Sequence, residues 1–363
     1  MRNSSLTILI IAILLSCIGI LSIYSSVYQR EAKQWQYQIW WVILGLIVFM
    51  FFANFNYRAL WDITYVLYAL ALLLLILVFI LGAIHLGAQR WLKFAVFNFQ
   101  PSEIAKLVIV IFLARYFSSK SIDQLSSPVG QKGIWQALAL PFIFIAIPMG
   151  LIVEQPDLGS GVMVFLIFIA MLYIARVRLK YIIILFAVAI LCLPVLWHFL
   201  KDYQKDRLLV FLNPNIDPLG AGYTVIQSKI AIGSGGFFGK GWLCGTQSQL
   251  HFLPESHTDF IFSTFSEEWG FIGSIVLLVL YYLLINQGIR IALRTSDSFG
   301  RLLAFGISLM LVIQVFVNIA MNLGLAPIVG LPLPLVSYGG SSVVTTFIAL
   351  GILANIDKTR TVF

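Results

Sequence analysis

Long apolar stretches recur along the whole of this 363-residue sequence. A transmembrane helix needs about 20 mostly apolar residues, because the hydrocarbon core of a bilayer is about 30 Å thick. Only 10 % of the residues are charged and 60 % are hydrophobic, which excludes a water-soluble globular enzyme. The sequence predicts an all-α polytopic membrane protein with about ten transmembrane helices, at residues 6–24, 39–55, 63–81, 104–117, 137–153, 158–175, 181–200, 269–285, 302–321 and 343–354.

Two of these stretches differ from the others. The fourth carries Glu103 and Lys106 at its start, and the tenth begins inside a Gly/Ser cluster. Polar groups and irregular backbone at membrane depth are tolerated where protein, and not lipid, surrounds them. We therefore expect these two stretches to be partly embedded in protein.

The basic residues predict the orientation of the helices. With the N-terminus in the cytoplasm, thirteen of the 23 Lys and Arg residues fall on the cytoplasmic side, against five in the short loops of the outer side. Short cytoplasmic loops carry an excess of Lys and Arg, so we expect both termini to be cytoplasmic. The formal net charge of +8 then follows from topology and gives no support to nucleic-acid binding.

One long outer segment, at about residues 201–258, interrupts the pattern between predicted helices 7 and 8. Loops longer than about 15 residues are usually functional or disordered. Aromatic residues throughout this one, and an apolar stretch at 225–232 followed by Gly233, predict a structured extracytoplasmic loop with a short helix. No repeat or linker divides the chain, so we expect a single transmembrane domain over residues 1–363.

The polar residues of three outer segments are the candidates for chemistry. A charge at helix-centre depth costs roughly 2.5–3.5 kcal/mol, so such residues usually pair or line a wet cavity. In the segment 251–262, Ser256 and Asp259 have the spacing of a capping box. Alternatively, Asp259 is a general base at a cavity mouth, and His257 competes for that role because it titrates nearer neutral pH. A cap tolerates Asn in place of Asp259, whereas a base does not.

Two further motifs hold charged residues with open roles. Glu103 and Lys106 are three residues apart and can pair on one helix face. Alternatively, or in addition, Lys106 forms a cationic site for a diphosphate or another anionic head group, together with Arg90 and Lys93 just upstream. Asp157 either caps the following helix or supplies a second carboxylate for a divalent cation or the substrate. Neither spacing nor composition decides between these roles.

Two glycine-rich stretches carry weaker signals. The stretch 233–241 fails both the P-loop and the dinucleotide patterns, which leaves a substrate-contacting turn. The stretch 330–342 breaks a span with prolines and restarts it with Ser341 and Ser342. A helix start can bind an anion, but a packed re-entrant turn is favoured here.

Four segments resemble, in order, the signatures of the SEDS family (shape, elongation, division, sporulation): FNFQPSEIAK at 97–106, EQPDLGSG at 154–161, FLPESHTDFIF at 252–262 and LPLPLVSYGGSS at 331–342. The resemblance covers nearly the whole chain. Gln247-Ser-Gln and the double Leu-Pro resemble the rod-shape branch of this family more than its division branch.

The resemblance implies an inverting peptidoglycan glycosyltransferase that polymerises lipid II at the outer face of the bacterial cytoplasmic (inner) membrane, for cell elongation and rod shape. It implies that Asp259 is the essential acid, that Glu103 and Lys106 are a cavity-lining pair, and that Asp157 is a further cavity acid. The implied partners are lipid II, the nascent lipid-linked glycan, a class B penicillin-binding protein that supplies the transpeptidase, and other elongation-complex proteins.

The leaving diphosphate of such a reaction requires charge neutralisation. Lys106, Arg90, Arg207 or Lys229 would supply it, or a divalent cation such as Mg²⁺ or Mn²⁺, or both. No organic cofactor is expected, and the sequence names no metal ligands. Two other functions stay open: a flippase for lipid-linked precursors and a non-catalytic scaffold of the wall-synthesis complex.

Overall fold

The computed structural model describes residues 3–30, 32–85, 88–94, 97–120, 138–218, 220 and 222–359. Most of them are helical, as the sequence predicts. The helices are α1 (Asn3–Val27), α2 (Gln34–Asn54), α3 (Ala59–Leu81), α4 (Pro101–Ser118), α7 (Leu140–Glu154), α8 (Leu158–Ile174), α9 (Leu179–Phe199), α10 (Asp202–Leu212), α11 (Tyr223–Gly235), α12 (Thr246–Gln249), α13 (Ile261–Arg294), α14 (Ser298–Asn322) and α15 (Gly340–Thr359).

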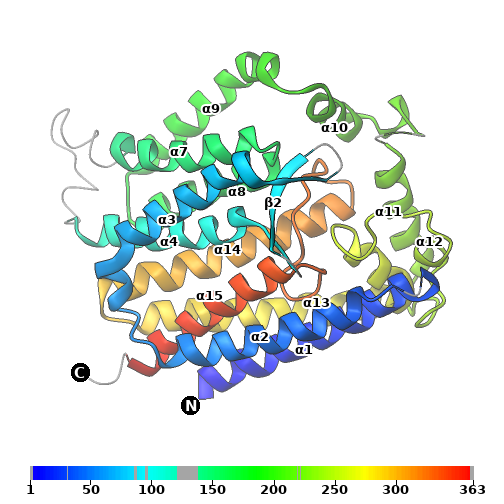
Figure 1. The fold of residues 1–363 in the computed structure, drawn as a ribbon, viewed down its shortest axis with the longest axis horizontal. Helices are drawn as coiled ribbons and strands as arrows, with labels where there is room; N and C mark the ends of the chain where they lie inside the picture. Colours follow the sequence, from blue (N-terminus) through cyan, green and yellow to red (C-terminus); the bar gives the residue numbers. More distant parts are fainter. Residues whose placement is uncertain are drawn as a thin grey trace.

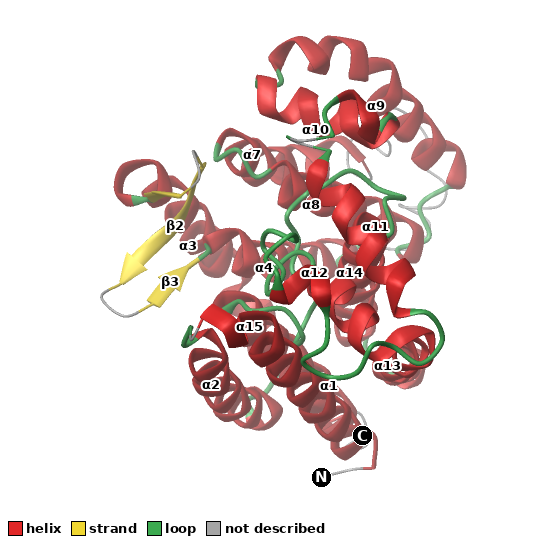
Figure 2. Ribbon diagram, turned by 90° about the vertical axis from the view of Figure 1, so that its right-hand side faces the viewer, coloured by secondary structure: helices red, strands yellow, loops and turns green. Residues whose placement is uncertain are grey.

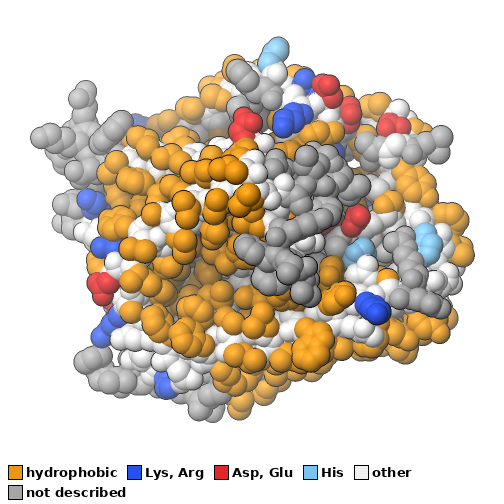
Figure 3. Space-filling model, in the orientation of Figure 1, with side chains coloured by type: hydrophobic (Ala, Val, Ile, Leu, Met, Phe, Trp, Pro, Cys, Tyr) orange, Lys and Arg blue, Asp and Glu red, His pale blue; other side chains and the backbone are white. Residues whose placement is uncertain are grey.

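Every predicted span overlaps one of these helices, although the fifth begins at residue 137, outside the described residues. Within the described ranges, six helices are long and apolar enough to cross a membrane: α1, α2, α3, α13, α14 and α15. The chain is thus a multi-pass membrane protein, while the count of ten spans stays a prediction. Figure 3 shows apolar side chains covering the middle of one face, with charged side chains towards its margins. A lipid environment accounts for such a surface.

The start of α1 and the end of α15 lie at the same end of the bundle (Figure 1). The Ser5 hydroxyl near the N-terminus donates to the Ala354 carbonyl in the last helix, at 3.3 Å. Helices α11 and α12 of the outer segment lie at the opposite end (Figure 1). That both termini are cytoplasmic stays a prediction.

Helix α4 lies inside the bundle, where it packs against α3, α8 and α14. Nearly all of its residues are buried, including Glu103 and Lys106. Helix α15 is similarly buried and packs mainly on α2. The expectation that protein surrounds these two helices is confirmed, and it explains how they hold polar residues without exposing them to lipid.

A small antiparallel sheet between α3 and α4 was not predicted from the sequence. Its strands are β1 (Ala83–His85), β2 (Ala88–Phe94) and β3 (Phe97–Phe99), in the order β1-β2-β3. Figure 2 shows β2 and β3 at the edge of the bundle. Arg90 and Trp91 follow one another in β2, and the pairing with β1 is irregular there: Ala83 pairs with Trp91 and Ile84 with Gln89, so Arg90 is the extra residue of the strand.

Helix α13 begins at Ile261, eight residues before the predicted span, and it kinks at Gly270, where φ is +65°. The outer segment binds the backbone groups that the kink frees. The amides of Phe271 and Ile272 donate to the carbonyls of Gly236 and Phe237, at 2.9 and 3.2 Å. Helix α11 extends to Gly235 and is followed by Gly236 with φ +54°, so the predicted end at Gly233 is wrong by two residues. Gly236 terminates the helix because its left-handed conformation carries no Cβ penalty.

Candidate active site

The turn before α13 holds Asp259 by its backbone. The side-chain amides of Asn318 and Asn322, one turn apart in α14, each donate to the Asp259 carbonyl at 3.0 Å. Both asparagines are fully buried. The Ser337 hydroxyl donates to the neighbouring Thr258 carbonyl at 2.6 Å. Three side chains thus fix the turn and leave the Asp259 carboxylate free to face its surroundings.

The capping-box prediction for Ser256 and Asp259 is wrong. The N-cap of α13 is Phe260, without a side-chain hydrogen bond, so the helix begins too late for Ser256 to cap it. Among the described residues, the structure shows no hydrogen bond to the Asp259 carboxylate. This excludes the capping-box role of Asp259, and its chemical role stays a prediction.

Two guanidinium groups approach the half-buried Asp259 side chain. A Cβ placed on Gly330 would lie 3.5 Å from Asp259 Oδ2 and 3.8 Å from Arg90 Nη1, so both groups border this glycine, although no ion pair joins Asp259 to an arginine among the described residues. Arg90 donates to the Pro156 carbonyl, and Arg207 donates to the Ile328 carbonyl at 3.4 Å. These carbonyls orient the two cations from the loops around the turn.

The surroundings set the charge of the acid. Burial, with a smaller contribution from Glu255, raises the pKa of Asp259 to about 6 although Arg207 and Arg90 act to lower it. Burial and the charge of Arg90 lower the pKa of Arg207. A carboxyl with a pKa near 6 is ionised at neutral pH and is a stronger base than an ordinary aspartate, which suits it to proton transfer.

His257 lies in a neighbouring cavity. Its backbone carbonyl accepts from the Tyr338 amide at 2.9 Å, and the two rings are 5.8 Å apart. The charges that act on Asp259 come from Glu255, Arg207, Arg90 and Asp157 and do not include His257. Which of Asp259 and His257 acts as the base stays a prediction.

Asp157 caps α8, which was one of the two roles predicted for it. Its Oδ1 accepts from the Ser160 amide at 3.2 Å. Its Oδ2 accepts from Gln100 Nε2 at 3.1 Å and from Ser102 Oγ at 3.2 Å, so it joins the starts of α4 and α8. Its field also reaches Asp259 and Arg207. In the described part of the chain, no three His, Cys, Asp or Glu side chains gather as metal ligands.

The remaining predicted cations lie in different places. Lys106 Nζ and Glu103 Oε1 form a buried ion pair at 2.8 Å, which confirms the pairing that their spacing indicated. Lys229 is exposed on α11, and its ammonium lies against Gly324, just after α14. Of the four candidate cations, the structure brings Arg90 and Arg207 to Asp259. The sequence reasoning missed Asn318 and Asn322, although polar residues inside an apolar span are themselves a signal.

Fold and site together define a class: a polytopic helical membrane protein with an acid and two arginines at one end of the bundle. The model of the cell cycle protein family FtsW/RodA/SpoVE matches residues 5–362. The chain belongs to this family, as the four motifs indicated.

Individual relatives agree with this placement. Peptidoglycan glycosyltransferase MrdB of Escherichia coli (strain K12) is 42 % identical over 98 % of this chain and 93 % of the relative. A probable peptidoglycan glycosyltransferase FtsW of Geobacter metallireducens is 38 % identical over 97 % and 94 %. The rod shape determining protein RodA of Thermus thermophilus matches with TM-score 0.71 at 28 % identity, over 98 % and 96 % of the two chains. A chain from a peptidoglycan synthase complex that coordinates polymerization and crosslinking matches with TM-score 0.82 at 34 % identity, over 98 % of both.

Proposed function

We propose that this chain is a peptidoglycan glycosyltransferase that polymerises lipid II for cell elongation. The relatives named as such enzymes are similar over nearly the whole chain. The observation that carries the mechanism is the Asp259 carboxylate, held by its backbone beside two arginines and without a hydrogen-bond donor among the described residues.

Asp259 is the general base of this reaction. It removes the proton from the acceptor sugar 4-hydroxyl, and the oxygen attacks the anomeric carbon of the donor. The bond from that carbon to the diphosphate breaks, and undecaprenyl diphosphate leaves with the electron pair. A single displacement of this kind inverts the anomeric configuration.

Arg90 and Arg207 stabilise the leaving diphosphate. Their guanidinium groups lie on the Asp259 side of the turn and present planar sets of donors that match phosphate oxygens. A Mg²⁺ or Mn²⁺ ion bound chiefly by the substrate phosphates would add to this charge. The Glu103–Lys106 pair and Asp157 fix the starts of α4 and α8 around the site.

The partner that completes wall synthesis is a class B penicillin-binding protein. The structural match to a chain from a complex that coordinates polymerization and crosslinking supports such an assembly. In the proposed topology, both termini are cytoplasmic and the Asp259 end of the bundle faces outward, where lipid-linked sugars are joined.

The test supplies fluorescent lipid II to the purified full chain in nanodiscs, with and without the partner, and compares wild type with Asp259→Asn. Asp202→Asn is the matched control, because it makes the same chemical change at a fully exposed side chain. We expect polymer from wild type and from the control, and a rate at least roughly 10²-fold lower from Asp259→Asn. If Asp259→Asn makes as much polymer as wild type, Asp259 is not the base. Translocation of lipid II without polymer indicates a flippase, and neither activity indicates a scaffold.

A further inference from the structure

A cavity of about 710 Å³ lies on the other side of the Asp259 turn. This volume is within the ~300–1,000 Å³ of small-molecule sites. It is lined by aromatic side chains and a few polar groups: Tyr37, Trp40, Trp41, Trp91, Tyr338, His257, Thr258 and Asn98, with Leu44, Gly339 and Gly340. We call it the aromatic cavity.

The aromatic cavity is separated from the two arginines by a single strand. Arg90 and Trp91 are neighbours in β2, and Arg90 meets the Asp259 side chain beside Gly330 whereas Trp91 lines the cavity. His257 and Thr258, which also line it, directly precede Asp259. The aromatic cavity therefore borders the turn that carries Asp259.

The cavity wall and the Asp259 turn form one hydrogen-bonded unit. Gln38 of α2 is fully buried, and its Nε2 donates to the Ser337 carbonyl at 3.1 Å. The Ser337 hydroxyl donates to Thr258, and the Tyr338 amide donates to His257. The loop before α15 is thereby tied both to α2 and to the turn that carries Asp259, which contributes to the preorganisation that a binding site needs.

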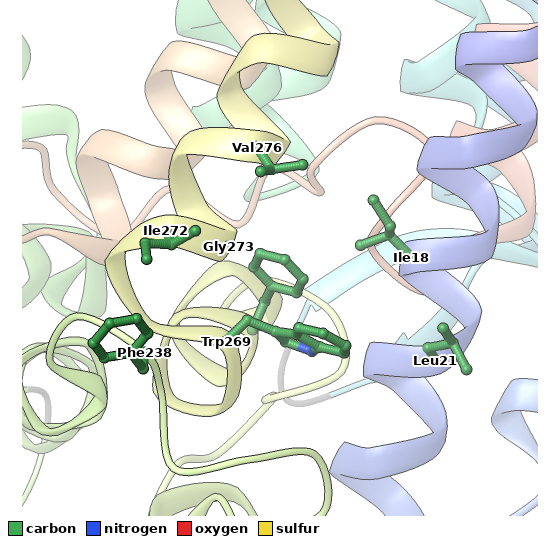
Figure 4. A pocket seen from close by; sticks show the side chains of 8 residues that line it. Ile18, Leu21, Phe238, Trp269, Ile272, Gly273 and Val276 are labelled. Carbon is green, nitrogen blue, oxygen red and sulfur yellow. The ribbon is translucent and has the colours of Figure 1, made fainter.

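The lining indicates which ligand fits. A second cavity, of about 400 Å³ between α1 and α13, has the character expected for a lipid chain, with a wall of Ile18, Leu21, Phe238, Phe265, Trp269, Ile272, Gly273 and Val276 (Figure 4). The aromatic cavity instead combines ring faces with imidazole, amide and hydroxyl groups. Ring faces carry negative charge density that attracts the C–H faces of a pyranose, and the polar groups match its hydroxyls.

We propose that the aromatic cavity binds pyranose rings of the glycan strand next to the ring that reacts at Asp259. This inference rests on the proposed polymerase function, and it assigns the glycan strand a binding site on the protein during polymerisation. Trp91 and Tyr338 supply stacking faces, and His257 and Asn98 supply hydrogen bonds. A strand held there stays bound between additions, so the cavity sets the length of the product.

The first test measures product length with fluorescent lipid II. Trp91→Ala removes one stacking face and Trp91→Phe restores a smaller one, while Trp197→Ala on α9 is the control because Trp197 is exposed and outside the cavity. A lost ring contact is expected to shorten the mean strand roughly 2- to 10-fold, with partial recovery in Trp91→Phe and wild-type length in the control. Wild-type length from a folded Trp91→Ala chain overturns the proposal.

The second test measures binding of chitotetraose, a β-1,4-linked GlcNAc oligomer, by saturation-transfer NMR on the full chain in nanodiscs. Asp259→Asn is expected to bind it as wild type does, and Trp91→Ala is expected to bind roughly 2- to 10-fold more weakly. Equal binding by Trp91→Ala overturns the proposal, as does displacement of the sugar signal by a short polyprenol at the same site. Because this readout needs no polymerisation, loss of the proposed function and loss of the sugar site give different results.

Discussion

Two carboxylates near the start of α13 have opposite surroundings. Glu267 Oε1 accepts from Lys240 Nζ at 2.7 Å and from the amide and hydroxyl of Thr246 at 2.8 and 2.9 Å. Asp259, in the turn just before the helix, has its backbone held and its carboxylate left beside two arginines. A carboxylate that accepts several hydrogen bonds therefore holds a loop in place, whereas a carboxylate that accepts none is available for proton transfer.

The largest effect is expected at Glu267, as a loss of stability. Glu267→Gln removes the charge that pairs with the Lys240 ammonium, and it replaces one of the two oxygens that accept from the Gln247 amide by an NH2 group, at a fully buried side chain. Loss of a hydrogen bond to a charged group costs about 1.5–3 kcal/mol. Thermal unfolding followed by tryptophan fluorescence measures it, with exposed Glu255→Gln as the stability control. An unchanged unfolding temperature for Glu267→Gln would contradict the proposed role of Glu267 in holding the loop in place.

Removal of a cation beside Asp259 is expected to reduce activity without loss of fold. Arg207→Gln removes one of the two charges proposed to stabilise the diphosphate, and loss of one such donor costs about 10²-fold in rate. It also removes a charge that lowers the pKa of Asp259, so the acidic limb of the pH–rate profile moves to higher pH. Lys229→Gln is the matched control, because the ammonium of Lys229 lies beside Gly324. Equal losses in both variants contradict the assignment of Arg207.

The asparagines that hold the turn are expected to have a smaller effect. Asn318→Leu removes the donors to the Asp259 and Leu331 carbonyls, and we expect kcat to fall about tenfold, since a lost buried hydrogen bond costs about 1–3 kcal/mol. Gln314→Leu is the control: it lies in the same helix and donates to the Pro332 carbonyl, away from the turn. Steady-state kinetics measure this effect. The same fall in kcat for Asn318→Leu and Gln314→Leu would indicate that the loss comes from altered helix packing and not from release of the Asp259 turn.

The smallest effect is the pH dependence of the wild type. The pKa of Asp259 is raised to about 6, and a base acts in its ionised form, so the rate falls as pH drops through 6. Between pH 7 and pH 5 we expect a loss of about tenfold from this group alone, since a single titration follows the fraction ionised. Initial rates across this range measure it. A rate that does not change with pH, under conditions where the chemical step limits the rate, would exclude proton transfer to Asp259.

Much of the fold followed from the sequence, because an apolar stretch long enough to span a bilayer has few alternatives to a helix. The Glu103–Lys106 pair followed too, since residues three apart on a helix are neighbours. The sheet was missed because β1 and β3 have only three residues each. The capping box at Ser256 and Asp259 was wrong because buried Asn318 and Asn322 hold the Asp259 carbonyl outside the helix.

The site followed only in part. The motif named Asp259, but the position of Arg207 depends on how α10 contacts the loops at Pro156 and Ile328, and no local spacing encodes that. The same holds for Lys229, whose position in the outer segment gave no indication that it lies beside Gly324. Tertiary packing places Arg90 and Arg207 near Asp259 and the other two candidate cations elsewhere. Composition and spacing could not identify these two.

The most direct measurement compares Asp259→Asn with Glu267→Gln in one lipid II polymerisation assay at pH 7, with the rate expressed per folded molecule. The account predicts that Asp259→Asn keeps the wild-type unfolding temperature and loses at least roughly 10²-fold of the rate. It predicts that Glu267→Gln unfolds at a lower temperature and keeps its rate while folded. Glycan strands made at the wild-type rate by Asp259→Asn would contradict the central claim.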